Sequence, residues 1–96
     1  MRLEDFQLQI NIKEKTLVKF GASWCGPCKM ADKVLAKVVE DGYDCVMSID
    51  VEDNPKLGVK YMVRTLPTYI IFYDGEEVER FTGRKTKQEL INKLNK

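Results

Sequence analysis

Two cysteines separated by two residues are the part of this sequence best suited to do chemistry. Cys25 and Cys28 lie in the segment Trp-Cys-Gly-Pro-Cys, and two thiols at this spacing at the start of a helix can form a disulfide. The attacking group in thiol–disulfide exchange is a thiolate. Because a helix N-terminus favours negative charge, we expect the pKa of Cys25 to fall well below about 8.5, the value of a free thiol. Cys28, one turn further on, is expected to be more buried and to act as the resolving thiol.

The residues around the two cysteines also favour exchange with a disulfide substrate. Pro27 in the first helical turn sacrifices no backbone hydrogen bond and stiffens the dithiol geometry. Gly26 lets a substrate backbone come close, and Trp24 offers an apolar wall beside the attacking sulfur. The chain contains no histidine, which excludes Cys–His and Ser–His catalytic pairs. We therefore expect the helix end, and not a neighbouring base, to activate Cys25.

Two other interpretations of the cysteine pair are weaker. A structural zinc site needs four ligands, and Cys45 is the third and last cysteine of a chain without histidine. A purely structural disulfide would close a very short loop and would stabilise little. We therefore predict no metal site, and we interpret Cys45 as a small hydrophobic residue within a strand.

Length and composition restrict the remaining function classes. The chain has 96 residues, which suits one domain over 1–96, and its 16 basic and 15 acidic residues leave a net charge of +1. This balance gives no electrostatic argument for binding nucleic acid or an anionic membrane. Acidic residues near the N-terminus, with no apolar segment after them, predict no secretory signal. Three cysteines favour a reducing compartment, and we expect a cytoplasmic monomer.

Hydrophobic periodicity predicts short strands that alternate with helices. The predicted strands are 17–20, 45–49, 68–73 and 78–82, and the predicted helices are 27–40, a short one from Pro55 and a last one after Thr86. Residues 2–12 fit either a strand or a helix, and we favour a short helix. The apolar face expected for the helix 27–40 comprises Met30, Ala31, Val34, Leu35, Val38 and Val39.

The order of these elements predicts the sheet. A strand, a helix and a second strand imply a parallel pair with a right-handed crossover. Asp74-Gly75 is a typical hairpin turn and adds an antiparallel strand. We therefore predict an α/β fold with a mixed four- or five-stranded sheet flanked by helices.

The sequence resembles the thioredoxin family. Trp24 to Met30, after Phe20 and Ala22, is similar to the active-site segment of that family, and 63–68 resembles the segment that holds its cis-proline, here Pro67. Three further matches lie in the C-terminal hairpin, at Phe72, Gly75 and Gly83. The resemblance runs from about Leu17 to the C-terminus and implies a thioredoxin-like fold with protein-disulfide reductase activity.

The resemblance also implies a substrate groove and a source of electrons. Leu66 would offer its backbone to an extended substrate strand. The implied groove residues are Trp24, Gly26, Pro27, Thr65, Leu66, Pro67 and Gly83. The reversible disulfide would be the electron carrier without a bound cofactor, and a thioredoxin reductase would re-reduce it with electrons from NADPH. Two alternatives remain: a glutaredoxin-like, glutathione-dependent reductase, suggested by the short N-terminus, and a binding subunit that uses the same fold.

The sequence departs from the family behind the disulfide. Lys19 stands where thioredoxins usually carry a buried aspartate, Ser48 replaces a lysine near it, and Lys33 replaces a helix proline. We favour the interpretation that the Lys19 ammonium reaches solvent at the edge of its strand while its stem is buried. The alternative is that the ammonium sits behind Cys28 and lowers the pKa of that thiol. Both interpretations predict slower proton delivery at the resolving step than in a typical thioredoxin.

Overall fold

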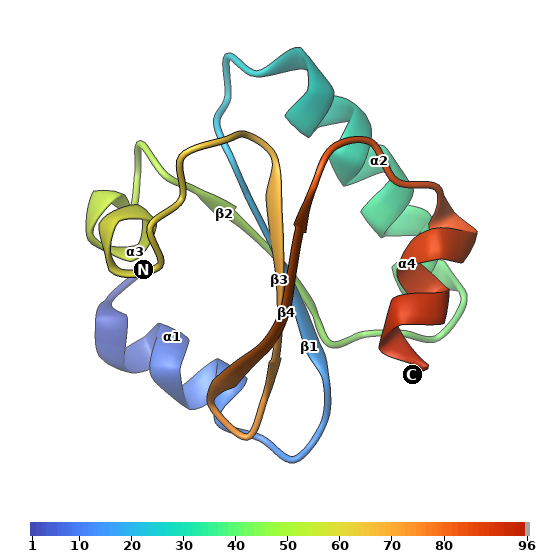
Figure 1. The fold of residues 1–96 in the computed structure, drawn as a ribbon, viewed down its shortest axis with the longest axis horizontal. Helices are drawn as coiled ribbons and strands as arrows, with labels where there is room; N and C mark the ends of the chain where they lie inside the picture. The colour runs from blue at the N-terminus through green and yellow to red at the C-terminus, as the bar shows by residue number, and fades with distance from the viewer. Residues whose placement is uncertain (96) are drawn as a thin grey trace.

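The computed structural model describes residues 1–95 and consists of a central sheet between two pairs of helices (Figure 1). The elements in chain order are α1 (Leu3–Ile10), β1 (Thr16–Gly21), α2 (Gly26–Glu40), β2 (Val46–Asp50), α3 (Pro55–Lys60), β3 (Thr68–Tyr73), β4 (Glu76–Thr82) and α4 (Lys87–Leu94). Each predicted strand and helix is present within a few residues of its expected bounds. The ambiguous N-terminal segment forms the short helix that we favoured.

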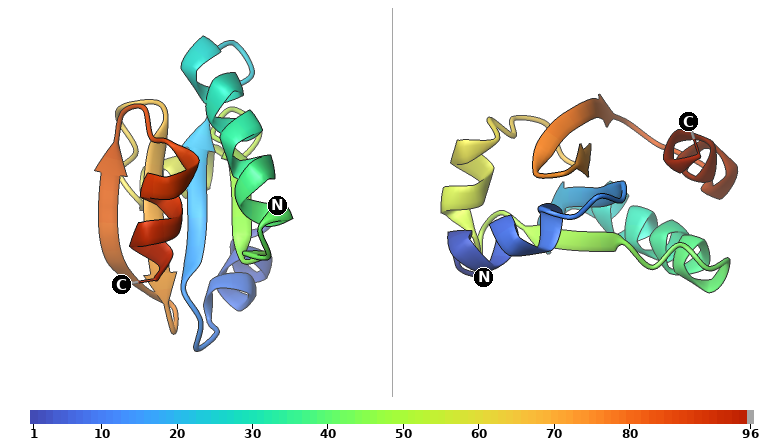
Figure 2. Two further views of the ribbon diagram at one scale, coloured as in Figure 1. Left: turned by 90° about the vertical axis from the view of Figure 1, so that its right-hand side faces the viewer. Right: turned by 90° about the horizontal axis from the view of Figure 1, so that it is seen from below.

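The sheet is mixed, and within residues 1–95 it has four strands in the order β2-β1-β3-β4. β1 pairs parallel with β2 and antiparallel with β3, and the hairpin β3–β4 completes the sheet. The helix α2 connects the parallel strands β1 and β2 along the chain. Figure 2 shows that it lies on one face of the sheet. This arrangement confirms the predicted parallel pair and places β1 inside the sheet, with a neighbour on each side.

Alternating side chains divide the interior into two hydrophobic clusters. On the side of α1 and α3, Val18 and Phe20 of β1 pack with Phe6 of α1. On the side of α2 and α4, Leu17 packs with Leu35 of α2. Since successive residues of a strand point to opposite faces, Lys19 and Gly21 of β1 lie on the side of Leu17, beneath α2.

Local sequence signals explain how the elements begin and end. The Thr86 side chain accepts a hydrogen bond from the Glu89 backbone, and the Glu89 side chain accepts one from the Thr86 backbone, so the predicted capping box of α4 is confirmed. Gly42 follows the end of α2 with a φ of 100°, a conformation that favours glycine. The β3–β4 turn has Asp74 and Gly75 at φ 52° and 82°, as expected of a hairpin turn.

The apolar face predicted for α2 is wider than the buried one. Ala31, Leu35 and Val38 are buried, whereas Met30 is 54% and Val39 44% exposed. The prediction was wrong for Met30 and Val39 because they flank the single stripe that α2 packs against the sheet and α4. No helix among the described residues is long and apolar enough to cross a membrane.

Candidate redox site

The disulfide between Cys25 and Cys28 lies at the N-terminus of α2. Cys25 is the N-cap residue, and its sulfur accepts a hydrogen bond from the Cys28 backbone N–H at 3.2 Å. The Cys25 N–H in turn donates to the carbonyl of Ala22 at 3.1 Å, which fixes the loop that leads into the helix. The geometry therefore places a helix end, with its partial positive charge, directly at one sulfur.

The two sulfurs differ in burial. Cys25 is 6% exposed and Cys28 is 1% exposed. Ala22 packs with both cysteines, and Leu66 covers this cluster from the opposite loop. A substrate that approaches from solvent therefore meets Cys25 first.

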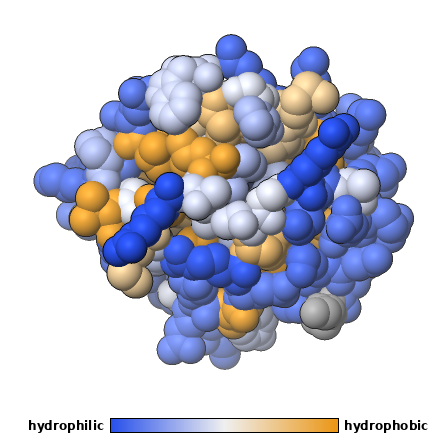
Figure 3. Space-filling model, turned by 45° about the horizontal axis from the view of Figure 1, so that its top comes forward, coloured by the Kyte–Doolittle hydropathy of each residue, from blue (hydrophilic) through white to orange (hydrophobic). Residues whose placement is uncertain are grey.

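Two hollows share Pro27 and Leu66 in their lining, and one of them borders Cys25. The first, of about 600 Å³, borders Cys25 and is lined by Trp24, Cys25, Gly26, Pro27, Val51, Val63, Arg64 and Leu66. The second, also of about 600 Å³, is lined by Pro27, Met30, Ala31, Val34, Thr65, Leu66, Pro67, Tyr69, Thr82, Gly83, Arg84 and Lys85. Figure 3 shows hydrophobic patches broken by hydrophilic side chains on this end of the molecule. All seven residues expected to line the groove border one hollow or the other.

The loop before β3 has the conformation that the resemblance implied. The Leu66–Pro67 peptide bond is cis, and the Thr68 hydroxyl donates a hydrogen bond to the Thr65 carbonyl, which ties the loop to the start of β3. Pro67 is buried, whereas Leu66 is partly exposed beside the cysteines. The loop thus presents Leu66 to the site.

Lys19 does not reach solvent, so the interpretation that we favoured was wrong. The residue is 3% exposed, and its Nζ lies 2.6 Å from Oδ1 of Asp32, four residues after Cys28 on α2. The Ser48 hydroxyl donates to the same carboxylate oxygen at 2.9 Å. The expectation failed because β1 is an inner strand, and because its lysine side chain points under α2.

The sequence reasoning missed two residues of this site, Asp32 and Gly21. A Cβ at Gly21 would lie 2.9 Å from both Cβ and Sγ of Cys28 and 3.1 Å from Nζ of Lys19. Only glycine leaves room for the sulfur and the ammonium at this position. The alternation along β1 could have drawn attention to this face, since Lys19 and Gly21 share the side that α2 covers.

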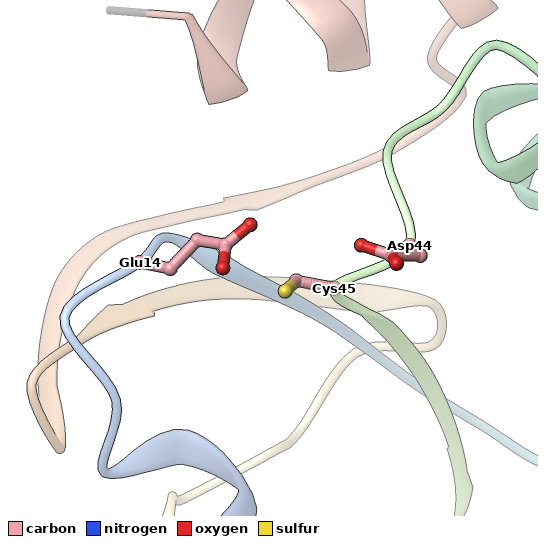
Figure 4. Close-up of side chains that lie close together, drawn as sticks. All are labelled: Glu14, Asp44 and Cys45. Carbon is pink, nitrogen blue, oxygen red and sulfur yellow. The ribbon is translucent and has the colours of Figure 1, made fainter.

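The third cysteine lies at the other end of the sheet. Cys45 precedes β2, and its sulfur lies near the carboxylates of Glu14 and Asp44 (Figure 4), with one candidate ligand atom of each group within 4.8 Å of the others. Burial, followed by a hydrogen bond to Glu14, raises the pKa of Cys45 to about 11. The sulfur is therefore a neutral thiol at pH 7.

A redox-active disulfide at a helix N-terminus, opposite a cis-proline loop on a mixed sheet, defines a thiol–disulfide oxidoreductase. The chain belongs to the thioredoxin family, because the family model described as thioredoxin matches residues 1–96. A thioredoxin of Staphylococcus epidermidis is 42% identical over 94 residues, which cover 96% of this chain and 89% of that protein. A thioredoxin of Staphylococcus aureus is 42% identical over 82 residues, covering 83% of this chain and 79% of that protein.

Solved structures agree with this assignment. A mutant thioredoxin from Halobacterium salinarum superimposes with a TM-score of 0.90 at 32% identity, over 99% of this chain and 84% of that one. Mitochondrial thioredoxin 3 from Saccharomyces cerevisiae, in its oxidized form, gives 0.85 at 28% identity, over 97% and 88% of the two chains. The thioredoxin assignment is thereby favoured over the glutaredoxin-like and binding-subunit alternatives.

Proposed function

We propose that this thiol–disulfide oxidoreductase reduces disulfides in proteins, with Cys25 as the attacking thiolate and Cys28 as the resolving thiol. The observation that carries these roles is the asymmetry of the pair: Cys25 is the N-cap of α2 and borders a hollow, whereas Cys28 is 1% exposed and borders neither. The helix end stabilises a thiolate at Cys25. No bound cofactor is required, because the dithiol itself carries two electrons.

The reaction then proceeds through two exchanges. The Cys25 thiolate attacks one sulfur of the substrate disulfide, that bond breaks, and the first substrate sulfur leaves as a thiolate. Cys28 loses its proton and attacks the Cys25 sulfur of the mixed disulfide, and the second substrate sulfur leaves. The substrate gains two electrons from the dithiol and two protons, one from Cys28 and one from solvent, and the protein is left with the Cys25–Cys28 disulfide.

The hollows beside Leu66 provide the substrate groove. Trp24, Gly26 and Pro27 would contact one flank of an extended substrate strand, and Thr65 and Gly83 the other. Pro67 holds Leu66 against the cysteines, where the Leu66 backbone would hydrogen-bond to the substrate as a short added strand. Main-chain recognition of this kind suits many protein substrates, since it reads no particular side chain.

We further propose that a thioredoxin reductase returns electrons to the protein from NADPH. Membership of the thioredoxin family supports this partner over glutathione. The unpaired Cys45 supports a reducing compartment, and we propose the cytoplasm and a monomeric state.

A coupled assay tests the proposed function. The oxidised protein is offered NADPH with its cognate thioredoxin reductase, and in a parallel reaction glutathione with glutathione reductase, with insulin as the acceptor in both. We expect NADPH consumption in the first reaction that disappears in Cys25→Ser and persists in the matched control Cys45→Ser. Turnover in the glutathione reaction alone would contradict the proposed electron donor, and turnover in neither would contradict the activity.

A further inference from the structure

An ion pair lies directly behind the resolving cysteine. Lys19 on β1 and Asp32 on α2 are joined at 2.6 Å, and only the carboxylate has access to water, because the side chain of Lys19 is 4% and that of Asp32 50% exposed. Burying an ammonium is costly, so a pair of this kind is weak evidence for a role in stability. Its position beside the redox couple suggests an electrostatic role.

Gly21 brings this ammonium close to the Cys28 sulfur. The sulfur lies 2.9 Å and the ammonium nitrogen 3.1 Å from the point where a Cβ of residue 21 would be. The two atoms are therefore no more than about 6 Å apart, the range in which an opposite charge favours the ionised form of a neighbour. The bond to Asp32 uses one of the three donors of the ammonium, which leaves donors for a thiolate at Cys28.

Cys25, which is a thiolate in the reduced protein, lies beside Cys28 on the side of the helix end. Among the groups packed behind Cys28, the ammonium of Lys19 is the principal charge. Ser48 of β2 is neutral and donates to Asp32. The pKa of Tyr69 on β3 is raised by burial and then by the charge of Asp32, so this phenol is neutral at pH 7. Asp50 of β2 accepts backbone hydrogen bonds from Glu52 and Asp53 in its own turn. Water screens the half-exposed Asp32, whereas it does not screen the buried ammonium.

We propose that Lys19, held in place by Asp32, stabilises the reduced dithiol through the Cys28 thiolate and thereby raises the reduction potential of the Cys25–Cys28 couple. The couple takes up two electrons when the disulfide opens. Cys25 then holds one negative charge at the helix N-terminus, and the Cys28 sulfur, when it ionises, holds the second beside Lys19. A couple whose reduced form is stabilised is more oxidising. The protein is thus a milder reductant than it would be with a neutral residue at position 19. The inference rests on the proposed function, since it assumes that the two cysteines cycle.

Equilibrium with glutathione buffers tests the proposal. The protein is incubated at a series of ratios of reduced to oxidised glutathione between pH 5 and pH 9, and alkylation with mass spectrometry gives the fraction of dithiol. We expect Lys19→Met to shift the equilibrium toward the disulfide by about tenfold at pH 8, which corresponds to about 30 mV. Asp32→Asn removes the negative charge that faces Lys19 and is expected to shift the equilibrium severalfold toward the dithiol. The matched control Lys33→Met removes an exposed charge from the same helix and is expected to change nothing.

The pH dependence separates an electrostatic role from a structural one. The difference in dithiol fraction between Lys19→Met and the natural chain should reach its full size above the pKa of an ordinary thiol. It should be lost as the pH falls and Cys28 becomes protonated in both proteins. Equal equilibria within twofold at every pH, or shifts of the same sign in Lys19→Met and Asp32→Asn, would overturn the proposal. A natural chain that equilibrates with glutathione but fails in the reductase assay would contradict the proposed function alone, and one that never equilibrates would overturn both.

Discussion

The unequal burial of the Lys19–Asp32 pair predicts that its two members contribute unequally to stability. Replacing Asp32 by alanine leaves an ammonium that is 4% exposed without its anion. Replacing Lys19 by methionine leaves a carboxylate that is 50% exposed and still bonded to Ser48, while the unbranched methionine fills the path of the lysine stem. Replacing Asp32 leaves the buried ammonium without a partner charge, so this variant should be less stable than the variant at Lys19.

The magnitude follows from the geometry of the pair. Two unit charges 2.6 Å apart attract by about 6 kcal/mol at an effective dielectric constant of about 20, and desolvation of the ammonium offsets a large part of this. We expect Asp32→Ala to lose about 2–4 kcal/mol of unfolding free energy and Lys19→Met to change it by less than about 1 kcal/mol.

Urea unfolding of the oxidised chains at pH 7 measures this difference. With a slope of about 1–2 kcal/mol per molar urea, the midpoint of Asp32→Ala should lie at least about 0.5 M below that of Lys19→Met. The difference should persist at about 1 M salt, because a buried charge is little screened. A Lys19→Met protein less stable than Asp32→Ala would refute the reasoning.

Two substitutions and one labelling experiment test other parts of the structure. Gly21→Ala places a Cβ 2.9 Å from the Cys28 sulfur, and should cost about 1–3 kcal/mol in urea unfolding and slow insulin reduction. Phe6→Ala removes a ring that is 1% exposed and packs edge-on against Phe72 at 5.8 Å, and should cost about 3–5 kcal/mol by the same measurement. In the oxidised chain, iodoacetamide should alkylate Cys45 at a rate that rises until the pH approaches about 11, because burial and Glu14 keep the thiol protonated.

Each of these three experiments has a matched control. Gly26→Ala adds a Cβ that meets nothing within 4 Å, and a loss of stability equal to that of Gly21→Ala would contradict the role of close approach. Leu8→Ala truncates a side chain of the same helix that is 71% exposed, and should change stability little. Glu14→Gln should lower the pH at which Cys45 reacts, since Glu14 contributes to its raised pKa. A reaction rate that has already levelled off near about pH 9 in the natural chain would show that the thiol is unperturbed.

Local signals explain why so much of the fold could be predicted. The Asp74-Gly75 turn, the Thr86–Glu89 capping box and the strand 68–73 each depend on a few adjacent residues, and the structure places all three as expected. The parallel pairing of β1 and β2 followed from the order strand, helix, strand along the chain and needed no contact information.

The site behind the disulfide could not be predicted in the same way. Lys19 and Asp32 are 13 positions apart, and their contact depends on how α2 lies over β1. A lysine in a strand ordinarily suggests an ammonium that reaches solvent. That expectation fails here because β1 lies between two neighbouring strands and α2 covers the face that carries Lys19. The exposure of Met30 has a similar cause, because it borders the hollow beside Pro67 and not the core.

The assignment of the attacking and resolving sulfurs is the central claim, and trapping the mixed disulfide tests it most directly. Cys28→Ser and Cys25→Ser, each in the reduced form, are mixed with a protein that carries one accessible disulfide, and the products are mapped by peptide mass spectrometry. The structure predicts a stable adduct through Cys25 in the Cys28→Ser chain and almost none in the Cys25→Ser chain, because Cys28 is 1% exposed. An adduct formed as readily through Cys28 would contradict the account.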